Sequence, residues 1–420
     1  MRHTISVLLV VAGAAVAAHA QSITTLGVLP GHDASTANAI SADGTTVVGY
    51  SVLTTDSSHP IAFRWTSGTG MTGLGAVGGF GTIGKAVSAD GSVVVGLIQQ
   101  GGAPQGSAFR WADGVMQDIG AGSQFSWTDA RAVSADGQRV AGAYQLGSTA
   151  AFSWTPQGGI VALAGLTTGA FARAQAISGD GLTVVGLGVQ GTASTTVRWA
   201  GAGVPESLGI FPGVANSQAT ATNSDASVIV GFGLSSSNRA LAYRWTPGHG
   251  MRDLGTIGGG SNNSAMAWGV SEDGFVIVGN HDTNPPLPTW GTFFWTPVLG
   301  MRDLWTFLQS TGADPSGWLG FDAAYAVSAD GRRIVGTGAY TGATGRERAW
   351  MATLPAWATC YANCDGSSQA PALSSSDFTC FLQHYAAGDP YANCDGSTVA
   401  PVINTSDLTC FLRKYAAGCN

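Results

Sequence analysis

The sequence has few charged residues. Asp, Glu, Lys and Arg make up 10% of its 420 residues, against roughly a quarter in an ordinary globular protein. Eighteen basic against 25 acidic side chains give a net charge of −7, the only lysines are Lys85 and Lys414, and no basic run occurs. Nucleic acids and anionic membrane surfaces are bound by clustered positive charge. The composition therefore argues against both kinds of partner.

Long apolar segments are missing after the first twenty residues. Met1–Ala20 starts with a short basic region, continues with an apolar run from Ile5 to Ala18, and has alanine at its last and third-last positions. This arrangement is typical of a signal peptide, and the run is short for a membrane span. We expect cleavage before Gln21 and a secreted mature protein without a membrane span.

Cysteine is missing from the first 359 residues. The chain has six cysteines: Cys360, Cys364, Cys380, Cys394, Cys410 and Cys419. Such a change in composition predicts a small disulfide-rich unit after a large cysteine-free domain. With a boundary near Pro355, we expect a signal peptide at 1–20, a first domain at 21–355 and a second at 356–420.

The first domain contains seven copies of one sequence phrase, typified by Ser-Ala-Asp-Gly followed by a Val/Ile-rich run that ends in Gly. The aspartates are Asp43, Asp90, Asp136, Asp180, Asp225, Asp273 and Asp330. Six residues after them come Gly49, Gly96, Gly142, Gly186, Gly231, Gly279 and Gly336. Each unit then has a tryptophan: Trp65, Trp111, Trp154, Trp199, Trp245, Trp295 and Trp350.

Each repeat is predicted to form four short strands. In the second unit these are 86–88, 93–95, 108–111 and 116–119, with the hairpin signal Ala-Asp-Gly between the first two. Seven such units predict an all-β fold, a seven-bladed β-propeller of four-stranded blades. The last unit lacks a fourth strand, whereas residues 23–29 resemble one. We expect the N-terminal strand to complete blade seven and close the ring, which hides the sheet edges.

The recurring residues are expected to serve the blades. Each aspartate is predicted to shape its hairpin turn, although a metal or catalytic ring of seven carboxylates is the alternative. The seven tryptophans are predicted to pack between blades.

Additional tryptophans gather in the later repeats. Trp290, Trp305 and Trp318 lie outside the repeated position, in the region with the longest loops. Exposed indole rings stack on sugars, so these three are the predicted ligand-binding residues, and packing of the loops is the alternative. We recognise no nucleophile, zinc, phosphate-loop or dinucleotide motif, so no catalytic residue is predicted.

The C-terminal 60 residues contain a duplication with a 30-residue period. Tyr-Ala-Asn-Cys-Asp-Gly-Ser occurs at 361–367 and at 391–397, and each copy is followed by a predicted helix that ends in Tyr-Ala-Ala-Gly. Ser374 or Ser375 is the expected cap of the first helix, and Gly388 its end.

The duplication also restricts the disulfides. An internal bond in each copy gives Cys364–Cys380 and Cys394–Cys410, and the two unmatched cysteines give Cys360–Cys419. The rival pattern exchanges partners between the copies, giving Cys364–Cys410 and Cys380–Cys394.

Both domains resemble known families. The repeats, from about 24 to 354, are similar to the HAF-repeat family of extracellular proteins, which implies the propeller and no established activity. The unit at about 360–420 resembles the GC-type dockerin domain, including its Gly418-Cys419 ending. That resemblance implies calcium binding in two half EF-hand loops and attachment to a cohesin-like or surface anchoring protein. The implied ligands are Asn363, Asp365, Asp377, Asn393, Asp395 and Asp407.

The dockerin resemblance has two departures. A standard loop begins with Asp, where Tyr361 and Tyr391 stand here, and its last acid follows the glycine more closely than Asp377 and Asp407 do. The alternative is that these Asn and Asp residues only shape turns in a disulfide-held loop.

The sequence as a whole predicts a secreted, non-catalytic binding or display protein. The propeller is the expected ligand-binding domain, with a polysaccharide as one candidate ligand. The C-terminal unit is expected to anchor the protein. A polysaccharide-active hydrolase or lyase on a propeller scaffold is one alternative. A structural envelope protein is another.

Overall fold

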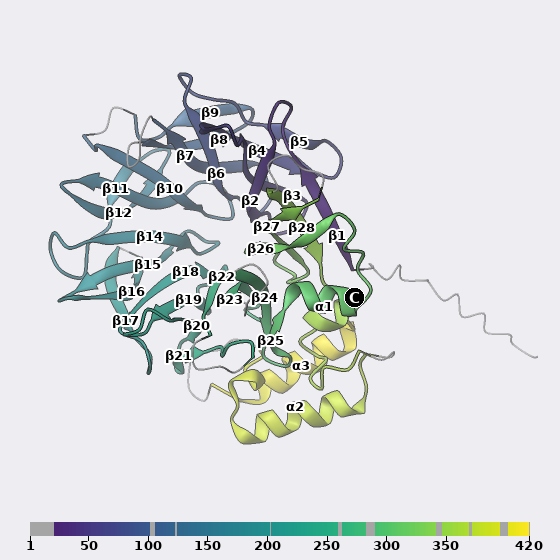
Figure 1. Cartoon of the computed structure of the whole chain (residues 1–420). Coiled ribbons are helices and arrows are strands. Elements are labelled where there is room, and N and C mark those ends of the chain that lie inside the picture. The colour runs from purple at the N-terminus through teal and green to yellow at the C-terminus, as the bar shows by residue number, and fades with distance from the viewer. Residues whose placement is uncertain are drawn as a thin grey trace, which may run out of the picture.

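The computed structural model shows a ring of seven four-stranded antiparallel sheets with a small helical unit against one side (Figure 1). It describes residues 21–419 apart from 101–105, 122–123, 202, 259–262, 283–289, 342–346, 369–371 and 395–401. The expected signal peptide and Asp395 lie outside the described residues. The predicted seven-bladed β-propeller is confirmed.

The blades follow one another along the chain, and each begins at the inner strand. Blade one is β2 (Ala34–Ile40), β3 (Thr46–Leu53), β4 (Asp56–Thr66) and β5 (Gly70–Gly73). Blade two is β6 (Gly81–Val87), β7 (Val93–Gln99), β8 (Gly106–Ala112) and β9 (Val115–Asp118). Blade three is β10 (Trp127–Val133), β11 (Val140–Leu146), β12 (Ser148–Thr155) and β13 (Gly159–Ala162). Blade four is β14 (Ala172–Ile177), β15 (Thr183–Gln190), β16 (Ala193–Ala200) and β17 (Val204–Gly209).

The last three blades have the same plan. Blade five is β18 (Asn216–Thr222), β19 (Ile229–Leu234), β20 (Ala240–Thr246) and β21 (Gly250–Asp253). Blade six is β22 (Ala265–Val270), β23 (Ile277–Asp282), β24 (Trp290–Thr296) and β25 (Gly300–Asp303). Blade seven is β26 (Trp318–Val327), β27 (Arg333–Tyr340), β28 (Glu347–Thr353) and the N-terminal strand β1 (Ser22–Gly27).

The N-terminal strand closes the ring, as predicted. β1 pairs antiparallel with β28, with Ile23 opposite Ala352 and Thr24 opposite Met351. Blade seven therefore contains both ends of the propeller chain, and the outer edge of β28 is paired with β1.

The repeated aspartates shape turns. In blade two, Asp90 Oδ1 accepts hydrogen bonds from Ser88 Oγ at 2.7 Å and from the Ser92 amide at 3.0 Å, and all seven aspartates accept the matching amide bond. Neighbouring turns are joined by backbone hydrogen bonds such as Ala42 N–H to the Ala89 carbonyl, 3.0 Å. The structure thus supports the turn-shaping role that the sequence predicted.

The repeated glycines lie where the inner strand bulges. Every inner strand has a register shift opposite its glycine, as between Gly84 and Ala86 in β6. A Cβ atom on any of the seven glycines would lie 1.8–2.0 Å from an inner-strand carbonyl oxygen. Only glycine leaves room for this approach. Five of the seven repeat tryptophans are buried in the blade cores, and the other two are half-buried.

Two helical parts complete the chain. The short helix α1 (Leu304–Ser310), which the sequence did not predict, links blades six and seven and buries Leu304 and Leu308. The C-terminal unit contains η1 (Ala356–Thr359), α2 (Ser375–Ala387), η2 (Pro390–Ala392) and α3 (Thr405–Ala417). Ser374 caps α2, and Gly388 ends it at φ 66°. In the described part of the chain, no helix has the length and apolar character needed to cross a membrane.

The disulfides join Cys360 to Cys419, Cys364 to Cys380, and Cys394 to Cys410. This is the pairing predicted from the duplication, and it excludes the exchanged pattern.

Candidate functional site

The propeller channel is lined by the residues at the inner-strand bulges. Each bulge turns one side chain toward the axis, five positions before the turn aspartate. These residues are half-buried and surround a cavity of about 270 Å³; they are Asn38, Lys85, Arg131, Gln175, Thr220, Trp268 and Tyr325. They differ in every blade although the surrounding phrase repeats. When one position varies while the surrounding repeat is constant, that position is a candidate for binding a specific ligand.

A charged network fills one wall of the channel, on blades two to four. Lys85 Nζ lies 2.6 Å from Asp129 Oδ1, and Arg131 forms an ion pair with the other oxygen of Asp129 at 2.8 Å. Arg131 also donates to Gln175 at 2.8 Å. Burial lowers the pKa of Lys85, and the neighbouring Asp129 opposes this effect. These cations are therefore engaged with protein partners.

The opposite wall opens into a pocket of about 580 Å³, which we call the mouth pocket. It is lined by Thr36, Tyr50, Met266, Trp268, Asn280, Trp290, Asp322, Ala323, Tyr325, Thr337 and Glu347. These residues come from blades one, six and seven. Thr36 and Met266 lie near the starts of the inner strands β2 and β22, away from the aspartate turns that follow the strand ends. Trp290 and Glu347 are the first residues of the third strands β24 and β28, at the same end of the blades. The pocket therefore opens at the channel end opposite those turns.

Acidic and amide groups give the mouth pocket its polarity. Burial, and then the like charge of Glu347, together raise the pKa of Asp322 to about 6. Asn280 is 8% exposed and donates to the Asp322 backbone carbonyl at 2.7 Å, while its Oδ1 has no hydrogen-bond partner among the described residues. Desolvated acceptors of this kind are suited to hydrogen-bond donors on a ligand.

The three tryptophans predicted to bind ligand lie in different places. Trp290 is 37% exposed and lines the mouth pocket. Trp305, on α1, is half-buried with its ring 5.1 Å from that of Phe321. Trp318 is 8% exposed and packs on Phe321 and Tyr340. Trp305 and Trp318 therefore pack the core, and of the three only Trp290 lines the mouth pocket. The sequence analysis did not select Trp268 and Tyr325, because only the bulge turns these repeat positions inward.

The two halves of the C-terminal unit meet through paired aromatic rings. Tyr361 and Tyr391, thirty residues apart, stack at 4.9 Å and exchange hydrogen bonds from each hydroxyl to the other's backbone carbonyl. Phe381 and Phe411 stack beside them at 4.1 Å. The tyrosines that replace the expected first loop aspartates therefore hold the two halves together.

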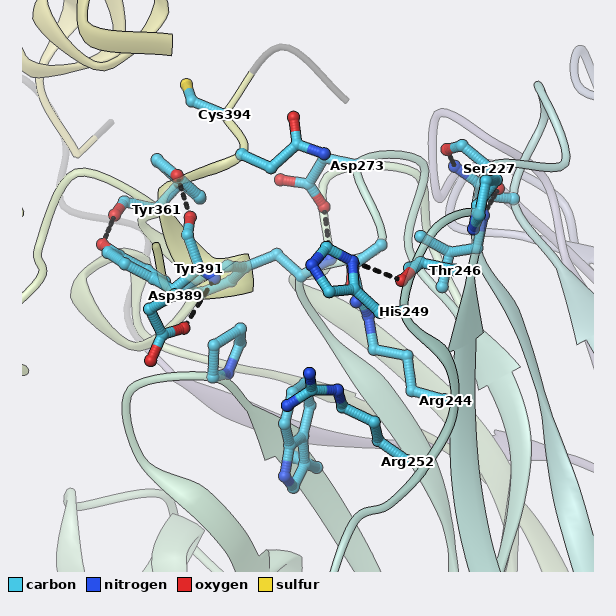
Figure 2. Close-up of a pocket in the computed structure, with 18 of the residues that line it drawn as sticks. Ser227, Arg244, Thr246, His249, Arg252, Asp273, Tyr361, Asp389, Tyr391 and Cys394 are labelled. Carbon is cyan, nitrogen blue, oxygen red and sulfur yellow. Dashed lines mark hydrogen bonds between the residues drawn. The ribbon is translucent and has the colours of Figure 1, made fainter. Parts of the chain in front are cut away.

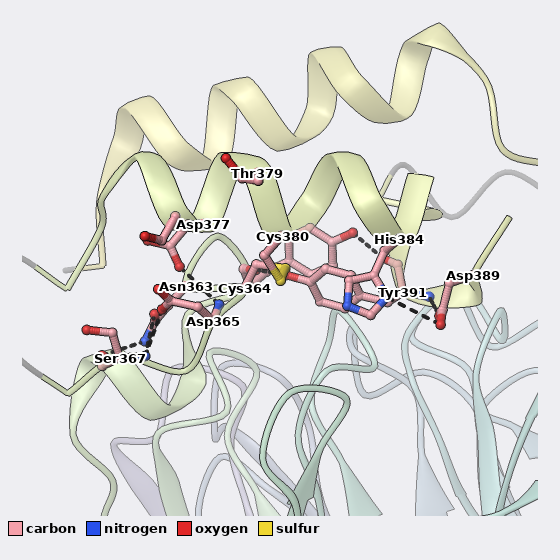
Figure 3. The surroundings of a disulfide bond; sticks show 12 residues. Asn363, Cys364, Asp365, Ser367, Asp377, Thr379, Cys380, His384, Asp389 and Tyr391 are labelled. Atoms are coloured by element: carbon pink, nitrogen blue, oxygen red, sulfur yellow. Dashed lines mark hydrogen bonds and ion pairs between the residues drawn. A yellow bond between two sulfur atoms is a disulfide. The ribbon is translucent and has the colours of Figure 1, made fainter. Parts of the chain in front are cut away.

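The first predicted calcium loop brings its three ligand candidates together (Figure 3). Asp377 is buried and accepts the Asp365 amide at 3.1 Å and the Ser374 amide at 2.7 Å. Asn363 and Asp365 both accept the Ser367 amide. Burial and then the nearby Asp377 raise the pKa of Asp365. The loop thus combines turn-shaping bonds with two carboxylates that repel each other.

The second loop is described only in part. Asp407 is buried and accepts the Asn404 amide at 2.8 Å, as Asp377 does in the first half. Asn393 is half-buried and lies beside the Cys394–Cys410 disulfide, and Asp395 lies outside the described residues.

A second group has metal-site spacing. The sulfur atoms of Cys364 and Cys380 and a ring nitrogen of His384 lie within 4.8 Å of one another. The two sulfurs form a disulfide, however, and thiolates are the metal-binding form of cysteine. This group is a possible metal site only after reduction.

A cleft of about 370 Å³ separates the C-terminal unit from blades five and six. Figure 2 shows Tyr361, Tyr391 and Asp389 on one side and Arg244, His249 and Arg252 on the other. Burial lowers the pKa of Arg244 to about 10, and Asp273 and Tyr361 oppose this effect. The cleft also contains turn residues of blades five and six, so the C-terminal unit lies at the turn side of these two blades.

Comparisons with known proteins identify the fold only. No protein-family model matches the chain, and no curated protein matches it either. The oligogalacturonate lyase of Vibrio parahaemolyticus superposes with a TM-score of 0.51 at 11% identity, covering 80% of this chain and 97% of the lyase.

Two other structures superpose with lower scores. The propeller domain of the Trilobed protease from Pyrococcus furiosus gives a TM-score of 0.49 at 9% identity, covering 76% of this chain and 94% of that domain. TolB from Acinetobacter baumannii gives 0.43 at 10% identity, covering 75% of this chain and 65% of TolB.

Proposed function

We propose that this chain is a secreted carbohydrate-binding protein whose propeller presents the mouth pocket to a polysaccharide. The observation that carries the proposal is the lining of this pocket, where Tyr50, Trp268, Trp290 and Tyr325 surround two carboxylates and a buried amide. Aromatic rings pack against the apolar faces of sugar rings, and the acidic and amide oxygens accept hydrogen bonds from sugar hydroxyls.

The placement of the C-terminal unit supports display of this pocket. The unit packs on the turn side of the ring, and the mouth pocket opens at the other end of the channel. A partner that holds the C-terminal unit therefore leaves the pocket accessible. We propose a cohesin-like or surface anchoring protein as that partner, in line with the dockerin resemblance.

Secretion is part of the same proposal. The signal-like N-terminus of the sequence and the three disulfides both fit a protein that folds in an oxidising compartment. The resemblance of the repeats to the extracellular HAF-repeat family agrees with this location.

The C-terminal unit is proposed to bind calcium. Asn363, Asp365 and Asp377 offer the oxygen ligands that calcium prefers. The fit rests on the raised pKa of Asp365, because a cation between the two carboxylates would relieve their repulsion. Asn393, Asp395 and Asp407 are the matching residues of the second half. Calcium would neutralise these loops and hold them in one conformation.

A second candidate function is glycoside hydrolysis at the mouth pocket. A general acid needs a carboxyl group whose pKa is raised toward neutral, with a second carboxylate nearby. Asp322, with a pKa raised to about 6, and Glu347 meet that description. In this case Asp322 would protonate the leaving oxygen.

One experiment separates these functions. The mature chain, residues 21–420, is tested for binding and for turnover on a polysaccharide panel. We expect saturable binding without product. Trp290→Ala should weaken binding at least about tenfold, on the scale of one lost stacking contact, with little change in melting temperature. Phe80→Ala, which removes an exposed ring outside the pocket lining, is the matched control.

Two results would count against the binding proposal. Product formation that is lost in Asp322→Asn would favour the hydrolase. Absence of binding to every polysaccharide would remove the carbohydrate proposal altogether.

A further inference from the structure

We infer that the mouth pocket selects sugars that carry a protonated amine, such as hexosamine units, over neutral and acidic sugars. This inference rests on the proposed carbohydrate binding and specifies its ligand class.

The charge of the pocket lining is one-sided. Asp322 and Glu347 both line it, and no described lining residue is basic. The neighbouring Arg348 is directed elsewhere, because its guanidinium donates to the backbone carbonyls of Asp33 and Glu347. Two carboxylates without a described cationic partner leave negative charge that a ligand ammonium group would balance.

The buried amide points to the same ligand chemistry. Asn280 lines the pocket and uses its Nδ2 on the Asp322 backbone, so its buried Oδ1, which has no hydrogen-bond partner among the described residues, is left as an acceptor. An ammonium group carries three donors and no acceptor. It can therefore donate hydrogen bonds to Asn280 and to a carboxylate at the same time. An acidic sugar would instead bring its own carboxylate, a further acceptor, next to these acceptors.

The aromatic lining adds to the selectivity. Cations are attracted to the faces of Trp and Tyr rings, most strongly where water is excluded. Trp268 and Tyr325 are half-buried, and their rings meet edge to face at 6.5 Å. The pocket thus combines aromatic faces with negative charge.

The basic residues on the channel wall formed by blades two to four determine where the ammonium group of the ligand can lie. Lys85 and Arg131 line the channel cavity, as Trp268 and Tyr325 do, and both are paired with Asp129. Arg173 lies near this pair, and burial and then Arg131 lower its pKa. These cations repel an amine, so the ligand ammonium group is held on the blade-seven side, near Asp322 and Glu347.

The test compares three oligosaccharides of equal length by calorimetry at pH 7 with the mature chain. One is built of glucosamine, one of N-acetylglucosamine and one of galacturonate. We expect the glucosamine oligomer to bind at least about tenfold more tightly than the acetylated one, and the galacturonate oligomer to bind most weakly.

Charge removal tests the cause. Glu347→Gln and Asp322→Asn should each reduce the preference for the amine severalfold, because each should weaken binding of the glucosamine oligomer more than binding of the acetylated one. Asp314→Asn, which removes an exposed carboxylate outside the pocket lining, should leave the preference unchanged.

The outcomes separate the two proposals. Equal affinity for glucosamine and N-acetylglucosamine, or tighter binding of galacturonate, overturns this inference while carbohydrate binding stands. An unchanged preference in both charge variants also overturns it. Binding of none of the oligomers nor of any polysaccharide in the panel overturns the proposed function and this inference together.

Discussion

The repeat glycine within the second strand of each blade lies close to a backbone oxygen of the inner strand. In blade two, a Cβ atom on Gly96 would lie 1.9 Å from the carbonyl oxygen of Ile83 and 2.9 Å from the ring of Phe109. Neither the strand backbone nor the buried ring can move away cheaply. Sterics therefore explain why the residue recurs in all seven repeats.

Gly96→Ala should lower the free energy of unfolding by about 3 kcal/mol or more, because it forces two paired strands apart. Gly68→Ala is the control, since nothing lies within 4 Å of its Cβ position. Urea unfolding of both variants measures the difference. If Gly96→Ala is as stable as Gly68→Ala, the close approach of the carbonyl is not what requires glycine.

Asp322 is expected to destabilise the folded chain at neutral pH. Its pKa rises from 3.8 to about 6 on folding, so the folded state binds more protons between these values and loses stability as the pH rises through them. Asp322→Asn should therefore stabilise the protein at pH 7, by on the order of 1 kcal/mol after allowance for solvent screening of this half-buried group.

The extra stability of Asp322→Asn over the unsubstituted protein should disappear near pH 4. Thermal unfolding of the two proteins across the pH range measures this difference. Asp314→Asn provides the opposite case, because hydrogen bonds from Ser316 lower the pKa of Asp314. The same trend with pH in both variants would argue against a specific effect at Asp322.

At the scale of elements, closure by β1 joins the two ends of the propeller chain. Deleting residues 21–30 leaves the outer edge of β28 unpaired and removes Leu26 and Leu29 from a buried cluster. We expect a drop of several degrees in melting temperature and a tendency to associate through the exposed edge. Replacing Thr24 and Thr25 by alanine, which keeps the backbone pairing, should have little effect. An unchanged melting temperature of the deletion would show that the ring does not depend on this strand.

The strands and their order could be predicted because the same sequence pattern occurs seven times in the chain. The Val/Ile-rich runs and the Asp-Gly turns depend on local backbone preferences, which are visible in sequence. The disulfides were predictable for a related reason, because duplicated segments repeat their internal bonds. Turn chemistry and repetition therefore account for most of the fold.

The site was less predictable because it depends on irregular features. The inward position of Trp268 and Tyr325 follows from a bulge, which no composition signal marks. The short helix α1 has only seven residues and is fixed by burial of Leu304 and Leu308. Trp318 is buried against Phe321 of its own strand and against Tyr340 of β27, and its sequence position does not mark this packing. Asp322 acquires its raised pKa from burial and from the charge of Glu347, which only the folded chain brings near it.

At the scale of the whole molecule, the propeller and the C-terminal unit share one hydrophobic core. A single cluster includes Phe275 and Phe294 of blade six, Leu304 of α1, and Phe381 and Phe411 of the C-terminal unit. The ring of Tyr361 lies 5.7 Å from that of Phe275, and Trp357 lies at the same distance from Phe307. The unit is therefore packed against the propeller as part of its core.

A shared core predicts a single unfolding transition for the mature chain with its disulfides intact. Calorimetry should show one peak, because separating the units exposes aromatic surface on both. Tyr361→Ala removes both the contact with Phe275 and the stack with Tyr391, so it should lower the melting temperature or split the peak. Trp357→Ala, which removes only the contact with Phe307 among these ring contacts, should lower it less. Leu412→Ala is the control, since this residue is 46% exposed on α3. Two transitions in the unsubstituted chain, with the later one insensitive to Tyr361→Ala, would mean that the units fold independently. The packing of the C-terminal unit on the propeller would then contribute little to stability.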